Sequence, residues 1–89
     1  MSADRRIRIR YFAWLRERLG TSEEDFELPS DMARVSQLIA TLRARGPVWD
    51  AVFAMTRTVR CAVNQEFAPG DAPIAPGDEV AFFPPVTGG

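Results

Sequence analysis

The proline pair Pro84-Pro85, which follows an apolar run ending at Phe83, constrains the fold of this chain more than any other feature. Each proline fixes φ near about −65° and has no backbone N–H, so a strand that reaches this point must end or stay at a sheet edge. At about 3.3 Å per extended residue, the rest of the chain can project about 20 Å. The sequence therefore predicts a folded domain over residues 1–83 and an extended, flexible tail over residues 84–89.

The tail ends in Gly88-Gly89, which carry no side chains. A terminal carboxylate behind two glycines fits a channel that is too narrow for a Cβ atom. Its pKa of about 3.5 keeps it ionised at neutral pH, and it stays unreactive until a leaving group is attached. In an arbitrary protein a terminal Gly-Gly is most often a frayed end, but the preceding run Phe-Phe-Pro-Pro-Val-Thr favours a functional tail here.

Composition excludes several function classes. The chain has 89 residues, enough for one domain, and 46% of them are hydrophobic, which favours a packed core. Its 11 basic residues, all arginine, nearly balance 12 acidic ones, so we expect no nucleic-acid partner. One cysteine and no histidine exclude an internal disulfide and a Ser-His-Asp triad, and leave no plausible zinc site. We expect no enzyme activity from the chain alone, no metal and no permanently bound cofactor.

The first periodic segment, Ile7 to Phe12, alternates as a half-buried strand with Ile7, Ile9 and Tyr11 facing the core. Because the N-terminus leads into this strand and not into a long apolar run, we expect neither a signal peptide nor a membrane span. The sequence therefore predicts a cytoplasmic protein with no membrane partner.

The next segments predict a helix and a second strand. Helical spacing runs from Ala13 to Leu19 and stops at Gly20, which accepts the positive φ of a helix end. We interpret residues 21–25 as an acidic turn and residues 26–28 as a short strand that forms a hairpin with the first.

The main helix is predicted over residues 33–45, where apolar residues recur at helical spacing (Val35, Leu38, Ile39 and Leu42). Ser30 and Asp31 are the obvious capping residues, yet the apolar stripe favours a later start near Arg34. Gly46-Pro47 would end this helix, and residues 48–55 form a short second helix.

The third strand is predicted over residues 58–64, with Val59, Cys61 and Val63 facing inward. Cys61 is then a small buried hydrophobe and not a reactive thiol. A turn at residues 64–66 leads to Phe67 on a short exposed strand, and a loop rich in proline and glycine joins it to the last strand, residues 78–83.

This order of elements predicts an α+β fold of the β-grasp, ubiquitin-like kind, in which a small mixed sheet packs on one main helix. The first and last strands are expected side by side in the centre. Strand alternation then predicts an apolar patch on the outer face of the sheet, formed by Phe12, Ala62, Ala81 and Phe83 and joined by Phe67. Exposed aromatic side chains near the base of a tail favour a docking surface.

The C-terminal run from Gly77 to Gly89 resembles that of the sulfur-carrier subunits of molybdopterin synthase. The resemblance covers nearly the whole chain: residues 10–13, 16–17 and 19–20 are similar to the opening of that family, and residues 62–65 to its central strand. The terminal motif is specific, whereas Gly-Gly alone is shared with ubiquitin-like proteins and other sulfur carriers.

The resemblance implies a cycle of sulfur transfer at Gly89. An adenylyltransferase of the ubiquitin-activating type would use ATP to adenylate the Gly89 carboxylate, and a sulfur donor system would convert it to a thiocarboxylate. The tail, Pro84, Pro85, Val86, Thr87, Gly88 and Gly89, would then enter the large catalytic subunit and deliver sulfur to cyclic pyranopterin monophosphate. The resemblance also implies that Phe12, Phe67 and Phe83 contact the large subunit, and that two small subunits flank a large-subunit dimer in a heterotetramer.

Three alternatives stay open. The tail could carry sulfur for another product, such as thiamine or cysteine, although the Phe-Phe-Pro-Pro-Val-Thr run argues against this. The chain could instead be a protein modifier that forms isopeptide bonds through Gly89. It could also be an interaction module with an inert tail.

Overall fold

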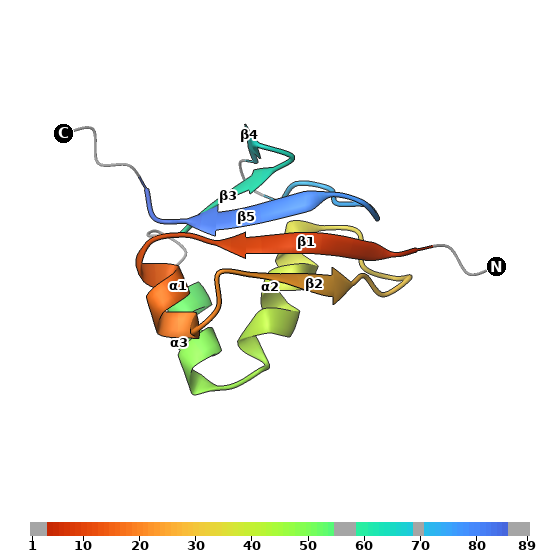
Figure 1. Ribbon diagram of the computed structural model, residues 1–89. Coiled ribbons are helices and arrows are strands. Elements are labelled where there is room, and N and C mark those ends of the chain that lie inside the picture. Colours follow the sequence, from red (N-terminus) through yellow and green to blue (C-terminus); the bar gives the residue numbers. More distant parts are fainter. Residues whose placement is uncertain (1–3, 55–58, 69–70, 86–89) are drawn as a thin grey trace.

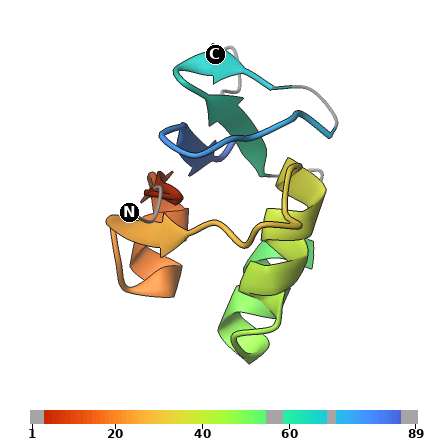
Figure 2. The same ribbon diagram turned by 90° about the vertical axis from the view of Figure 1, so that its right-hand side faces the viewer.

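A computed structural model describes residues 4–54, 59–68 and 71–85, and it places the helices of these residues on one face of a five-stranded sheet (Figures 1 and 2). In chain order the elements are β1 Arg6–Tyr11, α1 Trp14–Leu19, β2 Glu23–Glu27, α2 Val35–Arg43, α3 Pro47–Ala54, β3 Arg60–Val63, β4 Glu66–Phe67 and β5 Glu79–Phe83. The predicted order of strands and helices is confirmed, with bounds that differ by a few residues.

The sheet has the strand order β2-β1-β5-β3-β4, with β1 and β5 parallel in the centre and the other pairs antiparallel. Figure 1 shows β5, in blue, beside β1, in red. This mixed sheet on one main helix is the α+β, ubiquitin-like β-grasp fold that the sequence predicted. The strand that leads to the C-terminus is therefore held by hydrogen bonds on both of its edges.

The prediction of an acidic turn over residues 21–25 was wrong for its second half, because β2 begins at Glu23. Acidic residues are poor strand formers by propensity. Here the outward-facing acids Glu23 and Asp25 lie opposite Arg10 and Arg8 of β1, and Arg8 binds the Asp25 carboxylate at 2.9 Å. Opposite charges across neighbouring strands stabilise the pairing and extend the strand.

Helix α2 begins at Val35 with Arg34 as its N-cap, as the apolar stripe predicted. Gln37 reaches back to accept hydrogen bonds from the backbone N–H groups of Ala33 and Arg34, and Asp71 accepts one from the N–H of Ser36 at 2.9 Å. The free backbone N–H groups at the start of α2 are thus satisfied partly by Asp71, which lies in a loop distant in the sequence. The predicted end at residue 45 was wrong by two residues, since α2 ends at Arg43.

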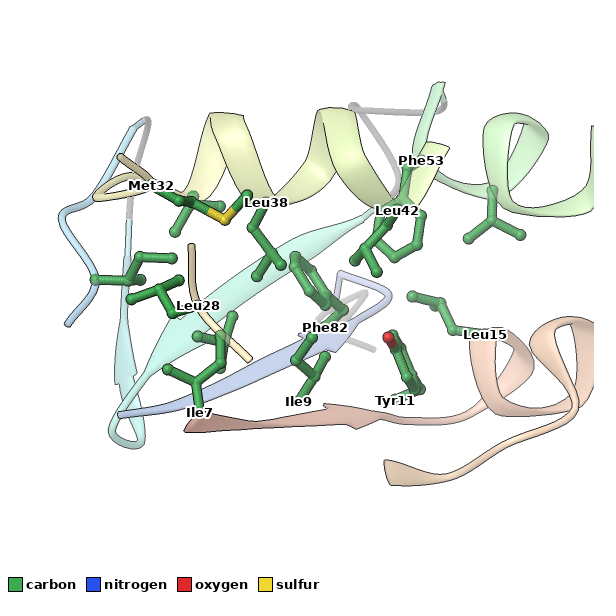
Figure 3. Packing of buried hydrophobic residues seen from close by; sticks show 14 residues of the cluster. Ile7, Ile9, Tyr11, Leu15, Leu28, Met32, Leu38, Leu42, Phe53 and Phe82 are labelled. Atoms are coloured by element: carbon green, nitrogen blue, oxygen red, sulfur yellow. The ribbon is translucent and has the colours of Figure 1, made fainter. Parts of the chain in front are cut away.

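The core lies between α2 and the inner face of the sheet (Figure 3). Its members are Ile7, Ile9, Tyr11, Leu15, Leu28, Met32, Val35, Leu38, Leu42, Val52, Phe53, Ile74, Val80 and Phe82. Phe82 of β5 is fully buried and meets the ring of Phe53 edge-on at 4.9 Å between centroids. The inward positions predicted for β1, α2 and β5 are confirmed, except that Ile39 is only partly buried.

A polar cluster ties the edge strand β2 to the end of the main helix. The Tyr11 hydroxyl donates a hydrogen bond to the Glu24 carboxylate at 2.8 Å, and the Arg45 guanidinium donates two to it at 2.7 and 2.8 Å. Arg45 also lies over the Trp49 ring, 4.6 Å from its centroid. Hydrogen bonds from Arg45, and then from Tyr11, hold the pKa of Glu24 below its ordinary value.

Acid should lower the stability of the fold partly by protonating the Glu24 carboxylate. Because the pKa of Glu24 is lower in the folded state, the Glu24 carboxylate contributes fully to stability above its ordinary pKa of about 4.3. This contribution is lost as the pH falls through the lower folded-state pKa. We expect Glu24→Gln to destabilise the protein by about 1–2 kcal/mol at neutral pH. Urea unfolding across a pH series should show this difference shrinking below pH of about 4.

Other carboxylates with lowered pKa, Asp4 and Asp71, titrate in both proteins and cancel in this comparison. A difference between wild type and Glu24→Gln that stays constant down to acid pH would mean that the charge of Glu24 does not contribute.

Candidate functional site

The outer face of the sheet, opposite the helices, carries the predicted apolar positions. Because Phe82 is fully buried on the inner face, its neighbours Ala81 and Phe83 point outward. Ala62 of β3 is paired with Ala81 and therefore lies on the same face. These residues are half-buried, as expected for small and aromatic side chains that share one surface.

Two further aromatic side chains extend this surface. Phe67 of β4 is 76% exposed, and its ring meets the Phe83 ring edge-on at 5.7 Å between centroids. Phe12, which directly follows β1, is 39% exposed. We call the set of Phe12, Ala62, Phe67, Ala81 and Phe83 the aromatic patch. An exposed apolar cluster of this kind is typical of a protein–protein contact surface.

Phe12 is fixed by hydrogen bonds on both sides of its backbone. Its N–H donates to the Phe82 carbonyl at 3.0 Å, and its carbonyl accepts from the Leu15 N–H at 3.2 Å. The Arg10 guanidinium lies 5.2 Å from the centroid of the Phe12 ring. The exposed ring of Phe12 therefore sits on a rigid part of the fold, next to β5.

The other half of the outer face is charged. Arg10 lies 3.8 Å from Glu23 on one side and 3.8 Å from Glu79 on the other, and Arg8 forms shorter ion pairs with Asp25 and Glu23. Opposite charges alternate here across three adjacent strands and offset one another. Because exposed pairs of this kind contribute little to stability, their main effect is to give the aromatic patch a polar border.

The predicted tail begins where the structure places the end of β5. Phe83 is the last residue of this strand, and Pro84 and Pro85 follow it outside the sheet, both half-buried. The strand break expected from the two prolines is confirmed. The remaining predicted tail residues (Val86, Thr87, Gly88 and Gly89) lie outside the described residues.

The first residue of β5 is held in place from the neighbouring hairpin. The Asn64 side chain donates to the Asp78 carboxylate at 3.0 Å and accepts from the Glu79 N–H at 3.0 Å. Asn64 itself has a positive φ of 52°, which asparagine tolerates better than most residues. These bonds fix the register of β5 and thus the point at which the tail leaves the sheet.

The remaining candidate groups show no arrangement for side-chain chemistry. Cys61 faces the core from β3, and burial raises the pKa of its thiol to about 11, so it carries no thiolate at neutral pH. In residues 4–54, 59–68 and 71–85, no three His, Cys, Asp or Glu side chains are grouped to hold a metal ion. Among the helices of the same ranges, none has the length and apolar character needed to cross a membrane.

The β-grasp fold, with a central strand β5 that precedes a Gly-Gly terminus in the sequence, places the chain among the ubiquitin-like proteins, a class that includes sulfur carriers. The ThiS family matches the chain over residues 9–89. The chain belongs to this family.

Individual relatives agree with this assignment. The chain is 40% identical over 83 residues to the molybdopterin synthase sulfur carrier subunit of Escherichia coli strain K12, covering 93% of this chain and 99% of that protein. It is 41% identical over 85 residues to the subunit of the same name from Chlamydomonas reinhardtii, with coverage of 93% and 98%. A solved structure of a putative molybdopterin converting factor, subunit 1, from Pyrococcus furiosus superimposes with a TM-score of 0.74 at 31% identity, covering 91% of this chain and 98% of that one.

The sequence interpretation missed the neighbours that hold the aromatic patch in place. Arg8, Arg10 and Phe12 share one face because they are spaced two residues apart, which was the available signal for the contact between Arg10 and Phe12. The sequence predicted that Phe67 joins the patch that contains Phe83, but not that the two rings are in contact, because that contact depends on the register of β3 against both β4 and β5.

Proposed function

We propose that this chain is the sulfur-carrier subunit of a molybdopterin synthase and donates sulfur from a thiocarboxylate at Gly89. The observation that carries the proposal is that the aromatic patch includes the last residue of β5. Phe83 is both a member of the patch and the last strand residue before the tail. A partner that covers the patch therefore receives the tail at a fixed point, and family membership and the named relatives support sulfur as the cargo.

The chemistry begins with activation of the terminal carboxylate. One oxygen of the Gly89 carboxylate attacks the α-phosphorus of ATP, pyrophosphate leaves, and an acyl-adenylate forms. Sulfide supplied by the sulfur donor system then attacks the acyl carbon and AMP leaves, so that a thiocarboxylate replaces the carboxylate. This step needs an adenylyltransferase of the ubiquitin-activating type, and its use of ATP fits a location in the cytoplasm. The chain contributes only the reacting terminus.

Transfer takes place in the large catalytic subunit. The thiocarboxylate sulfur attacks a carbon of the cyclic pyranopterin monophosphate precursor and displaces an oxygen substituent from that carbon. Water then cleaves the bond between the Gly89 acyl carbon and the sulfur, which leaves the sulfur on the product and restores the Gly89 carboxylate. Two such deliveries build the dithiolene that later holds molybdenum. Docking of the aromatic patch makes the sulfur transfer effectively intramolecular, which is why a protein serves as the donor.

The test is the intact mass of the chain after incubation with ATP, a sulfide source and the cognate adenylyltransferase. We expect a gain equal to the replacement of one oxygen by one sulfur, and loss of that gain when the large subunit and the pterin precursor are added. No gain would contradict a sulfur carrier. A gain that this acceptor cannot discharge would indicate another pathway, such as thiamine or cysteine synthesis, and higher-mass conjugates with other proteins would indicate a modifier.

A further inference from the structure

Arg60, the first residue of β3, lies on the outer face of the sheet beside the last residue of β5. Cys61 packs against the core, so strand alternation directs Arg60 to the opposite face. Arg60 is paired with Phe83, and directly opposed residues of antiparallel strands share a face, with their Cβ atoms about 5 Å apart. The exposed side chain of Arg60 therefore borders the aromatic patch at the point where β5 ends.

The charge of Arg60 is not offset in the way that the other charges of this face are. Each arginine of β1 has a carboxylate oxygen within 3.8 Å of its guanidinium group (Arg6, Arg8 and Arg10). In the part of the chain that the structure describes, no carboxylate lies within ion-pair distance of Arg60. The end of the sheet that precedes the tail thus carries a positive charge beside two exposed aromatic rings.

The position of Arg60 separates it from the reacting groups of the proposed cycle. Phe83, opposite Arg60, is six residues before Gly89. An extended tail of that length spans about 20 Å. The phosphates of ATP and of the pterin precursor meet the chain at Gly89, so they stay beyond the reach of Arg60. The surface that comes close to Arg60 is the protein surface that covers Phe83.

A partner that covers Phe83 changes the surroundings of Arg60. A surface that excludes water from the Phe83 ring also removes water from the guanidinium group beside it. Removing water from a charge is strongly unfavourable unless an opposite charge replaces the water. A carboxylate does this well, because the planar guanidinium group can donate two parallel hydrogen bonds to its oxygens. Arginine at the border of an apolar contact surface is therefore suited to an acidic side chain of the partner.

We propose that Arg60 binds a carboxylate side chain of the large subunit and thereby fixes the orientation in which the aromatic patch docks. The inference rests on the proposed function, because it assumes that the large subunit covers Phe83. Apolar contact between aromatic rings and a partner is not directional. An ion pair beside the last residue of β5 favours one register of the two surfaces and disfavours the others.

The experiment compares two neutral substitutions, Arg60→Gln and Arg18→Gln. Arg18 is an exposed arginine of α1, which lies with the other helices on the opposite face of the sheet, so its replacement removes the same charge away from the patch. Binding of each folded variant to the cognate large subunit is measured by calorimetry. At low salt we expect Arg60→Gln to weaken binding about tenfold, the loss for one charge-assisted hydrogen-bonded pair, and Arg18→Gln to change it less than about twofold.

Two further measurements decide whether Arg60 acts through its charge. The factor between wild type and Arg60→Gln should shrink at about 1 M salt, where the Debye length is about 3 Å. Arg60→Glu should weaken binding more than Arg60→Gln does, because it sets two like charges against each other. An unchanged affinity for Arg60→Gln, an equal loss for Arg18→Gln, a loss that salt does not reduce, or equal affinities for Arg60→Glu and Arg60→Gln would each overturn the inference.

The proposed function has a separate readout in the same experiment. If the wild-type chain binds the large subunit and Phe83→Ala weakens that binding, the docking face stands, and only the role of Arg60 depends on the Arg60 variants. If the wild-type chain does not bind the large subunit, the proposed function and this inference both fail.

Discussion

A chain that lacks Gly89 is expected to lose sulfur transfer completely and to keep its fold and its affinity for the large subunit. The reason is covalent, because in the proposed cycle the acyl group that is adenylated and thiocarboxylated belongs to this residue. Gly88 would then carry the terminal carboxylate, about 3.3 Å short of the required position. A displacement of this size removes the reacting atom from the geometry in which transfer is effectively intramolecular.

Three measurements separate this result from simple unfolding. Thermal unfolding of the truncated chain should match that of wild type, and calorimetry should give the same affinity for the large subunit. The truncated chain should also inhibit transfer by the intact thiocarboxylated chain, since it still occupies the docking face. Loss of folding would contradict a purely chemical role for Gly89, and full transfer activity would remove Gly89 from the reaction.

The fold was predictable where local periodicity and tertiary packing agree. Alternation marked β1 and β5, and the spacing of Val35, Leu38 and Leu42 marked α2 and its late start. Prediction failed where a distant segment determines the outcome. Glu23 belongs to a strand because arginines of β1 face it, a pairing that the local sequence of β2 does not reveal.

In the candidate site, too, the features set by the local sequence could be predicted, and those set by distant segments could not. The end of β5 at Phe83 could be predicted because Pro84 and Pro85 act on their own backbone, whatever the rest of the chain does. The outward direction of Phe12 and Phe83 followed from strand alternation. The positive φ of Ala13 did not, because it results from hydrogen bonds that join β1, β5 and α1 in three dimensions.

The proposed docking side chains are held rigidly because two of them, Ala81 and Phe83, belong to the central strand β5. β5 is paired with β1 on one edge and β3 on the other, and its inner side chains Val80 and Phe82 are fully buried. The exposed side chains of the same strand are therefore fixed by the core that lies behind them. In the proposed function, a rigid sheet face beside the predicted tail would combine tight docking with a terminus that enters a narrow channel.

Two adjacent substitutions should separate folding from docking. Phe82→Ala removes a fully buried ring that contacts Phe53 and Tyr11, so we expect a loss of about 3–5 kcal/mol in the free energy of unfolding. Phe83→Ala removes an outward ring that contacts Phe67, so it should leave stability nearly unchanged. It should instead weaken binding of the large subunit by about 1–3 kcal/mol, the range for truncating an interface anchor.

Val48→Ala supplies the control, because Val48 is 50% exposed on α3, on the helical side of the sheet. It should change neither binding nor stability by more than about 0.5 kcal/mol. Urea unfolding and calorimetry on all three variants give both quantities. If Phe83→Ala bound the large subunit as tightly as wild type does, the aromatic patch would not be the docking face. If Phe82→Ala stayed as stable as wild type, the inward register of β5 would be wrong, because alternation assigns the two rings to opposite faces.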